Sequence, residues 1–382
     1  MRGSGFLTFF LLGLGCVPPE PPEPPEAQWR EVLGLPAGLE LPSIPATNPP
    51  TNEKRELGRR LFYDKRLSGN ETQSCASCHE QRLGFTDGKK TPTGSTGHVL
   101  ARNSQGLQNA AWNVSLTWAS NVLLTLEDQL EVPIRNDRPT ELGVTDGNVG
   151  EVLQRFESDP DYAQRFRDAF PESETGVTMG KVVLALATFC RALNGADSPY
   201  DRFVAGDASA ISDSAKRGLD LFNGERFECH HCHKGVNLTV SYRDQKTSPN
   251  KSVTFFNNGL YNVGNAGGYP AIDQGLFELT LEPRDRGFFR PQGLRNVALT
   301  APFMHDGSID TLTDVVRHYA SGGRNVEMGP NAGDGRLNPL KSGLVRGFPA
   351  TNDEIADVVA FLESLTDSTF VTNPALSDPF AP

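Results

Sequence analysis

The sequence has no excess of basic residues and no apolar run long enough to cross a membrane. Lys and Arg number 36 against 47 Asp and Glu, which gives a formal net charge of −11 over 382 residues. Nucleic-acid-binding domains carry basic surfaces, so this balance argues against a nucleic acid as partner. The apolar run 6–12 falls well short of the about 20 residues that a membrane-spanning helix needs. The composition is that of a soluble, acidic, exported protein, and the length suggests two domains.

Cysteine is also scarce, and four of the six cysteines fall into two C-x-x-C-H motifs, Cys75–His79 and Cys229–His233. Such a run predicts covalent attachment of a c-type haem. The two thiols add to the vinyl groups along one porphyrin edge, and the following histidine becomes the proximal iron ligand. A zinc site or a redox dithiol is the alternative, but a zinc ribbon places its cysteine pairs about 15–20 residues apart. Two haems are therefore predicted, held by Cys75, Cys78, His79, Cys229, Cys232 and His233.

The two remaining cysteines, Cys16 and Cys190, are too far apart to indicate a disulfide framework. Residues 1–16 are typical of an export signal, with Arg2 before the apolar run. Lipidation of Cys16 is favoured over simple cleavage, because this cysteine ends the run. Residues 17–50 are rich in proline and are predicted to form a semi-rigid tether. Cys190 lies on the apolar face of a predicted helix, so a buried structural thiol is favoured over a reactive one.

Strand patterns are few, and the helical patterns form a weak internal repeat. A helix over 52–62 leads into the first motif, and one over 213–222 leads into the second. Closing helices are predicted at 178–194 and 352–365, the latter beginning with a Thr351–Glu354 capping box. We therefore predict an all-α, loop-rich fold with two cytochrome c-like domains, each carrying one covalent c-type haem. The domains span 51–195 and 196–370, the linker lies within 194–207, and 371–382 is a tail.

Further segments follow the two motifs in a fixed order, among them Gly84–Gly88, Ser198–Phe203, Gly293–Pro302 and Phe303–Ser308. In this order the segments are specific, and a cytochrome with a single haem has none of them. Over about 50–368 the chain resembles the bacterial di-haem cytochrome c peroxidases and their relative, the methylamine-utilisation protein MauG.

The resemblance implies a division of labour between the domains. The haem on His79, in the N-terminal domain, reacts with H2O2, and the haem on His233 takes and stores electrons. The implied reaction reduces H2O2 with electrons from a small redox protein, such as a cytochrome c or a cupredoxin. MauG-like oxidation of a partner protein is the second form. The alternative from another class is a di-haem electron-transfer or redox-sensing cytochrome without turnover. The expected location is the periplasm, with membrane contact through a lipid anchor.

The resemblance also assigns catalytic residues to the first haem. Trp118 matches the family's inter-haem tryptophan, with Trp112 as the rival, although the residues that follow Trp118 depart from the family's pattern. Gln129 and Glu141 match the glutamine and glutamate of the distal pocket. A carboxylate there can carry a proton from the inner to the outer peroxide oxygen. The alternatives are ordinary packing for Trp118 and a solvated loop charge for Glu141.

The second axial ligand of the electron-storing haem is implied to be Tyr319. Cytochrome c peroxidases place a methionine at this position, whereas MauG places a tyrosine. Methionine is itself rare in the sequence, and the rivals are Met304 and Met328. The identity of the axial ligand is a main determinant of haem potential, and a tyrosinate lowers that potential.

Two further sites are carried over by resemblance alone. His98 lies in the loop where cytochrome c peroxidases keep a histidine that caps the resting first haem, and a water-exposed loop histidine is the alternative. Asn103, Thr300 and Pro302 match family positions that hold a structural Ca2+, which prefers oxygen ligands of this kind.

Overall fold

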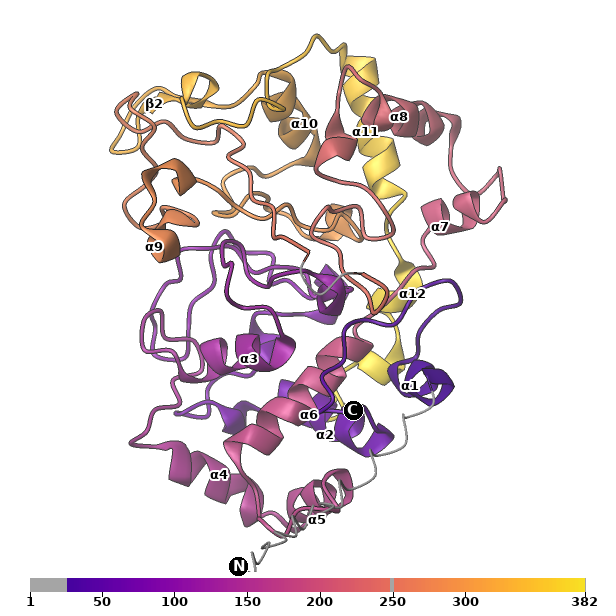
Figure 1. Ribbon diagram of the computed structural model, residues 1–382, viewed down its shortest axis with the longest axis vertical. Coiled ribbons are helices and arrows are strands. Elements are labelled where there is room, and N and C mark those ends of the chain that lie inside the picture. Colours follow the sequence, from indigo (N-terminus) through magenta and orange to yellow (C-terminus); the bar gives the residue numbers. More distant parts are fainter. Residues whose placement is uncertain (1–25, 248–250, 382) are drawn as a thin grey trace, which may run out of the picture.

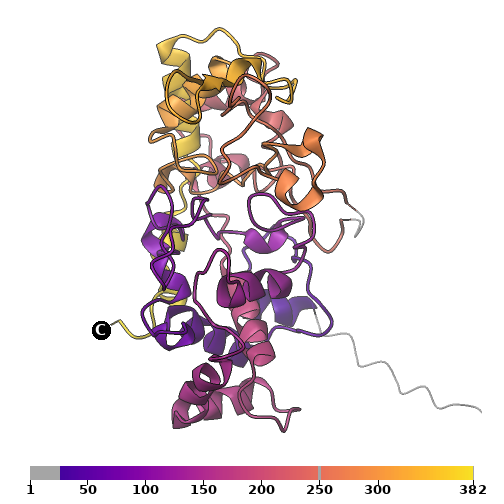
Figure 2. The same ribbon diagram turned by 90° about the vertical axis from the view of Figure 1, so that its left-hand side faces the viewer.

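The computed structural model describes residues 26–247 and 251–381, which form two lobes stacked along the long axis of the molecule (Figure 1). Helices α1 to α6 lie in the first lobe, and α7 to α11 lie in the second. Figure 2 shows the same two lobes from the side. The predicted export signal and the Cys16 lipidation site lie outside the described residues.

The first lobe is built around two crossed helices, α2 (Asn52–Tyr63) and α6 (Met179–Ala192). Both were predicted from the sequence, and α6 is buried along almost its whole length, including Cys190. The helices α3 (Leu126–Arg135), α4 (Val149–Glu157) and α5 (Pro160–Ala169) complete this lobe. Their apolar faces share one core with α2 and α6. The prediction of a buried structural thiol at Cys190 is confirmed.

The second lobe repeats this crossing with α8 (Asp213–Asn223) and α11 (Asn352–Glu363). The predicted Thr351–Glu354 capping box is present at the start of α11. This lobe also contains the helices α7 (Pro199–Val204), α9 (Phe277–Thr280) and α10 (Leu312–Ala320). The α7 helix interrupts the predicted linker. A separate apolar core surrounds α8 and α11.

A glycine allows each helix pair to cross at close range. A Cβ on Gly58 of α2 would lie 2.0 Å from the carbonyl oxygen of Ala185 in α6. A Cβ on Gly218 of α8 would lie 1.9 Å from the carbonyl oxygen of Asp357 in α11. Both contacts are far shorter than van der Waals distance, so no other residue fits at either crossing. The weak sequence repeat therefore corresponds to a repeated helix packing.

Most of the remaining chain is loop, and the all-α prediction holds only in part. The strands β1 (Asn325–Val326) and β2 (Gly333–Asp334) pair antiparallel in the second lobe. Isolated bridges also join loops within and between the lobes. Within the described part of the chain, no helix has both the length and the apolar character that a membrane span requires.

The segment predicted as a tether over 17–50 is folded over its described part, which corrects that prediction. The helix α1 (Glu26–Leu33) packs against α6, and Leu33 and Leu41 bury against Ala192. The Arg55 guanidinium donates to the Val32 carbonyl at 2.7 Å. Proline content alone predicted an extended spacer, but the apolar residues between the prolines supply a packing surface.

The C-terminal residues return to the first lobe instead of ending as a free tail (Figure 1). The helix α12 (Ser368–Val371) brings Phe370 to within 5.4 Å of the Phe85 ring, measured between ring centroids. The Tyr63 hydroxyl donates to the Leu376 carbonyl at 2.7 Å. Both the start and the end of the described chain therefore pack against the first lobe.

Candidate functional site

The two C-x-x-C-H motifs adopt the same local structure. Each begins with a single 3-10 turn, Cys75–Ser77 in the first lobe and Cys229–His231 in the second. The amide of the following histidine donates to the carbonyl of the first cysteine at 3.0 Å in both motifs. This turn brings both cysteines of a motif and its histidine to one side of the chain, as attachment along one porphyrin edge requires.

Both proximal histidines are held by a backbone carbonyl. His79 Nδ1 lies 2.7 Å from the Phe85 oxygen, and His233 Nδ1 lies 3.1 Å from the Leu238 oxygen. A carbonyl oxygen can only accept, so each Nδ1 carries the proton and each Nε2 keeps its lone pair for a metal. Phe85 and Leu238 both have left-handed backbones, with φ of 62° and 47°. The left-handed turn aims each carbonyl back at its histidine.

Burial at both motifs suits an apolar, covalently held cofactor. Burial raises the pKa of Cys78 and Cys229 to about 12 and that of Cys232 to about 11. Burial also lowers the pKa of His79 and His233, so both imidazoles are neutral, as iron ligands must be. The residues at both motifs therefore fit a c-type haem. Zinc binding would instead require stabilised thiolates, which these surroundings disfavour.

A large cavity adjoins the second motif and reaches the boundary between the lobes. Cys229, Cys232 and His233 line one part of it, and Tyr319 from α10 lines another. Burial raises the pKa of Tyr319 to about 12, while a hydrogen bond from Asn258 lowers it. The phenol therefore lies in the same cavity as the proximal histidine, where an axial ligand of the second haem would be.

The two methionine rivals differ in position. Met328 is 84% exposed and lies away from the cavity, so it is not an axial ligand in this structure. Met304 lines the cavity with a left-handed backbone at φ 74°, and its sulfur accepts from Asn258 Nδ2 at 3.4 Å. Asn258 therefore touches both remaining candidates, Tyr319 and Met304. No sequence pattern had indicated Asn258.

Trp118 lies in the wall of the same cavity, at the junction of the lobes. Its indole Nε1 donates to the Asn103 carbonyl at 2.8 Å. The rival Trp112 is fully buried instead, and its Nε1 donates to the Glu40 carbonyl at 2.9 Å, inside the first lobe. Of the two, Trp118 is therefore the tryptophan that lines the cavity of the second haem motif.

The three residues predicted to bind Ca2+ also line this cavity. Asn103 comes from the first lobe, while Thr300 and Pro302 come from the second. The Asn103 side-chain amide donates to the Lys89 carbonyl at 2.8 Å, and this bond fixes its orientation. The three residues therefore line one cavity, although they are far apart in sequence.

Gln129 and Glu141 are carried by neighbouring segments of the first lobe. Gln129 lies on α3, and two backbone hydrogen bonds pair the loop after Glu141 with the end of α3. Leu142 N donates to Pro133 O at 2.9 Å, and Val144 N donates to Ile134 O at 3.0 Å. The side-chain oxygen of Gln129 is buried and has no hydrogen-bond partner among the described residues. Such an oxygen is available to a ligand.

Glu141 is partly buried and lies near the first haem motif. Burial raises the pKa of its carboxyl to about 7. Its negative charge in turn contributes to raising the pKa of Cys78, after burial and Asp87. A carboxyl with this pKa can both accept and return a proton near neutral pH, as a general acid–base catalyst must. The burial of this carboxyl argues against the alternative from the sequence, a solvated loop charge.

His98 is exposed at the tip of a short loop closed by the Thr93–Val99 bridge. This exposure corresponds to the second of the two alternatives, a water-exposed loop histidine.

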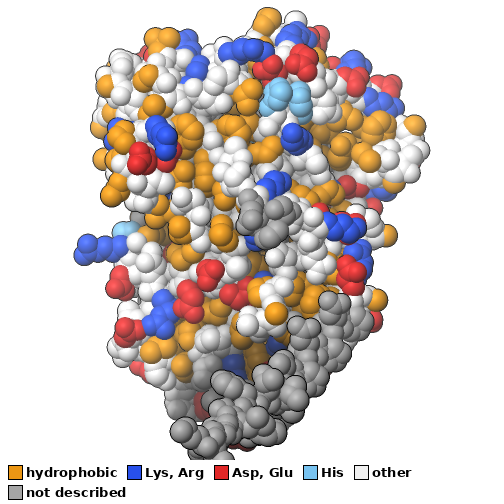
Figure 3. Space-filling view, in the orientation of Figure 1, with side chains coloured by type: hydrophobic (Ala, Val, Ile, Leu, Met, Phe, Trp, Pro, Cys, Tyr) orange, Lys and Arg blue, Asp and Glu red, His pale blue; other side chains and the backbone are white. Residues whose placement is uncertain are grey.

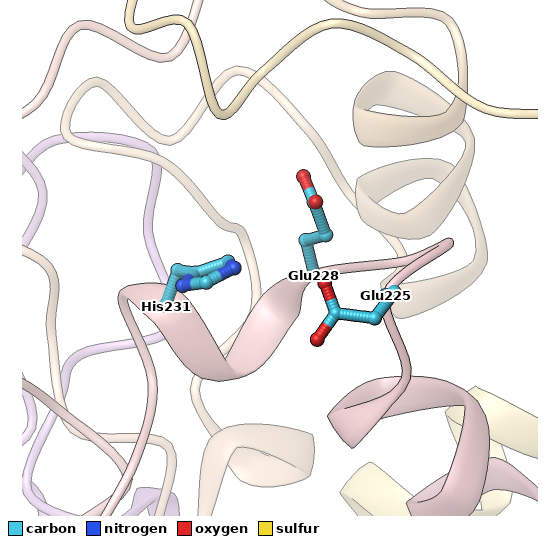
Figure 4. Close-up of side chains that lie close together, drawn as sticks. All are labelled: Glu225, Glu228 and His231. Carbon is cyan, nitrogen blue, oxygen red and sulfur yellow. The ribbon is translucent and has the colours of Figure 1, made fainter.

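His231, inside the second motif, lies beside two carboxylates (Figure 4). Ligand atoms of Glu225, Glu228 and His231 lie within 4.8 Å of one another. Glu228, however, already pairs with the Arg346 guanidinium. His231 is partly exposed, and the motif's own histidine, His233, already takes the place of the proximal ligand.

Two haem-attachment turns in two lobes, with a carboxyl of raised pKa near one and a phenol in the cavity of the other, indicate a di-haem c-type oxidoreductase. A model of the family "Di-haem cytochrome c peroxidase" matches residues 52–209. The chain is 32% identical to the methylamine utilization protein MauG of Methylorubrum extorquens, over 92% of this chain and 90% of that protein. It is 31% identical to cytochrome c551 peroxidase of Pseudomonas aeruginosa, over 83% and 80% of the two chains. The chain therefore belongs to the di-haem cytochrome c peroxidase and MauG family.

Solved structures agree with this assignment. A "MauG-like protein associated with microbial copper homeostasis" superposes with a TM-score of 0.89 at 44% identity, covering 91% of this chain and 99% of that one. The di-haem peroxidase BthA of Burkholderia thailandensis shares the fold, with a TM-score of 0.63 at 22% identity. The predicted resemblance is thus confirmed, and the chain is an oxidoreductase of the di-haem peroxidase or MauG type. Membership implies two c-type haems.

Proposed function

We propose that this chain is a MauG-like di-haem enzyme that uses H2O2 to oxidise a partner protein. The observation that carries the choice is Tyr319 in the cavity wall of the second haem motif. Among relatives, the 44% identity to a MauG-like protein supports the same choice. That protein's association with copper homeostasis suggests a related role here. The alternative reaction, rapid reduction of H2O2 with electrons from a small redox protein, would take place at the same first haem.

Each lobe is proposed to be a cytochrome c-like domain with one haem, the first peroxidatic and the second electron-storing. When bound, the haem iron on His79 supplies the site where peroxide is reduced, and that on His233 supplies an electron store. Overall, H2O2, two protons and two electrons give two waters. Acidic and basic side chains are interspersed on the face shown in Figure 3. The charge of this face therefore does not indicate which electron donor would bind there.

The chain's own groups supply the proton transfer. Glu141 takes the proton from the inner peroxide oxygen and returns it to the outer oxygen, which leaves as water. Its pKa of about 7 suits both steps. The free Gln129 oxygen accepts a hydrogen bond from the peroxide or the departing water. Trp118 provides an oxidisable ring between the two haem motifs.

Three further parts of the proposal rest on sequence and family. Asn103, Thr300 and Pro302 hold a structural Ca2+ between the lobes. The run before Cys16 directs export, and lipid attachment at Cys16 ties the protein to a bacterial membrane, facing the periplasm. The Asn103 carbonyl accepts from Trp118, so an ion on the Asn103 side chain would also steady the indole.

The proposal is tested by mixing the purified ferric protein with stoichiometric H2O2 and following the Soret band. We expect a rapid change in the wild type. Replacement of Tyr319 by Met should alter the ferric spectrum of the second haem, while Tyr63→Phe, which loses a hydroxyl bonded to the Leu376 carbonyl in the first lobe, should not. No reaction in either the ferric or the half-reduced protein would favour the non-catalytic cytochrome. Fast turnover with a small cytochrome c would favour the donor-dependent peroxidase.

A further inference from the structure

Arg290 is a buried cation without a counter-charge. Three arginines in the described residues are more than nine-tenths buried: Arg191, Arg290 and Arg295. Arg191 pairs with Glu127 at 2.8 Å, and Arg295 pairs with Asp201 at 2.7 Å. Arg290 pairs with no carboxylate of the described chain.

The hydrogen bonds of Arg290 are all to neutral groups. Its Nε donates to the Thr117 carbonyl at 3.0 Å, and its Nη2 donates to Gln105 Oε1 and Gln292 Oε1 at 2.8 Å each. Its Nη1 is buried without a partner. Burial lowers the pKa of this guanidinium to about 9. A buried, unpaired charge is costly unless a ligand completes it.

The position of Arg290 indicates what that ligand is. Arg290, Gln105 and Gln292 all line the cavity that contains Cys229 and His233. The backbone of Gln292 hydrogen-bonds His233, and the backbone of Gln105 hydrogen-bonds His79. Arg290 is therefore one residue away from both proximal histidines. Of the two motifs, it is Cys229–His233 whose cysteines and histidine line the cavity that Arg290 faces.

A c-type haem carries two propionate carboxylates on the edge away from its vinyl groups. The thioether cysteines fix the vinyl edge, so the propionates extend into the cavity away from Cys229 and Cys232. We propose that Arg290 binds a propionate of the haem at Cys229–His233 through Nη1, and thereby sets the potential of that haem. This inference rests on the proposed function, since it requires a haem in this cavity.

Arg290 also holds the backbone at Thr117 and Trp118, the former through its side chain and the latter through its amide. The Arg290 amide donates to the Trp118 carbonyl at 2.8 Å, and its guanidinium holds Thr117, the preceding residue. Thr117 has a left-handed backbone with φ of 63°, which depends on such support. Propionate binding and placement of the indole are thus coupled through one residue.

Other titratable groups line the cavity and bear on any pH effect. They are Glu228, Cys229, Cys232, His233, Arg295, His305 and Tyr319. Glu228 and Arg295 are paired with Arg346 and Asp201, and burial keeps His305 neutral. His233 and Tyr319 would be held by the iron in the loaded protein. The thiols become thioethers in the loaded protein. A free propionate would therefore be the group that titrates here.

The test compares the loaded full-length protein with Arg290→Gln, Arg290→Lys and Arg284→Gln. Arg284 is exposed in the same segment, so its loss removes the same charge outside the cavity. The readouts are the midpoint potential of each haem from about pH 5 to 8, and the propionate bending bands in resonance Raman spectra. Potentials are read by spectroelectrochemistry, so peroxide activity is not needed.

In Arg290→Gln we expect the potential of the second haem to fall and to decrease further as pH rises, because an ionised propionate stabilises ferric iron. Arg290→Lys should keep most of the wild-type potential, and Arg284→Gln all of it. The propionate beside Arg290 should stay ionised over this range, so the potential should depend less on pH in the wild type and in Arg290→Lys than in Arg290→Gln. An equal pH dependence in all three proteins overturns the inference.

The inference about Arg290 would also be overturned if wild type and Arg290→Gln had equal midpoint potentials and equal propionate bands. Mass and haem content of the wild type are measured first. A protein without haem at Cys229 and Cys232 would refute the proposed function together with this inference. Normal attachment with an unchanged propionate band would refute the inference alone.

Discussion

Replacing Glu141 by Gln should inactivate the enzyme and stabilise its fold. The change keeps the shape of the side chain and removes its ability to exchange a proton. Loss of a general acid–base group typically costs 10²–10⁴ in rate. The peroxide-dependent change of the Soret band should slow by about that factor in Glu141→Gln. In the wild type the rate should rise with pH through about 7 as the carboxyl ionises.

The effect on stability follows from the same carboxyl. Its pKa rises from 4.5 in the unfolded chain to about 7 in the folded protein. The folded state therefore binds more protons than the unfolded state in this range, and stability falls as pH rises from about 4.5 to 7. At 1.36 kcal/mol per pKa unit, the full penalty above pH 7 is about 3 kcal/mol. Gln carries no charge, so the variant escapes this penalty.

Denaturant unfolding of wild type and variant at about pH 4 and about pH 8 measures the difference. We expect equal free energies of unfolding at the lower pH and a more stable variant, by up to about 3 kcal/mol, at the higher pH. The control Glu174→Gln alters an exposed carboxylate and should change neither stability nor rate. A variant that reacts with peroxide at the wild-type rate would refute the role of Glu141, and equal stability at both pH values would refute its burial.

Other predictions concern the second haem and the helix crossings. Tyr319→Phe should convert the second ferric haem to a form without its phenolate ligand and raise its potential, read by absorption and electron paramagnetic resonance. Trp118→Phe should slow electron transfer between the haems by tenfold or more, equivalent to about 1.4 kcal/mol of barrier, with peroxide binding unchanged. Gly218→Ala should lower stability by about 1–3 kcal/mol or more, because its Cβ meets the Asp357 carbonyl. Gly150→Ala, with open space around it, should gain up to about 1 kcal/mol. Thermal unfolding that ranks the two alanine variants equally would contradict this packing.

The helices that surround each haem motif were predictable because their apolar residues repeat at helical spacing. The Thr351–Glu354 capping box fixed the start of α11 in the same way. The crossing glycines were visible in the sequence as Gly58 and Gly218, each four residues before a phenylalanine. Their role in the helix crossings could not be predicted from the sequence, because each glycine packs against a helix more than 100 residues away.

The site was predictable where chemistry demands a local spacing and not where it is assembled from distant loops. The motifs Cys75–His79 and Cys229–His233 predict haem attachment without any other information. Arg290 and Asn258 sit in loops without periodic pattern, and their importance comes from what the fold places beside them. The packing of residues 26–50 and of the C-terminal residues was missed for the same reason, because proline content hides apolar contacts made over long sequence distances.

The central claim is that a peroxide-reactive haem and an electron-storing haem work together in one chain. It is tested most directly by rapid mixing of the ferric protein with one equivalent of H2O2, with the Soret band recorded for wild type and Glu141→Gln. The account predicts a rapid spectral change in the wild type that is slowed by about 10²-fold or more in the variant. A wild-type protein that does not react in either its ferric or its half-reduced state would contradict it.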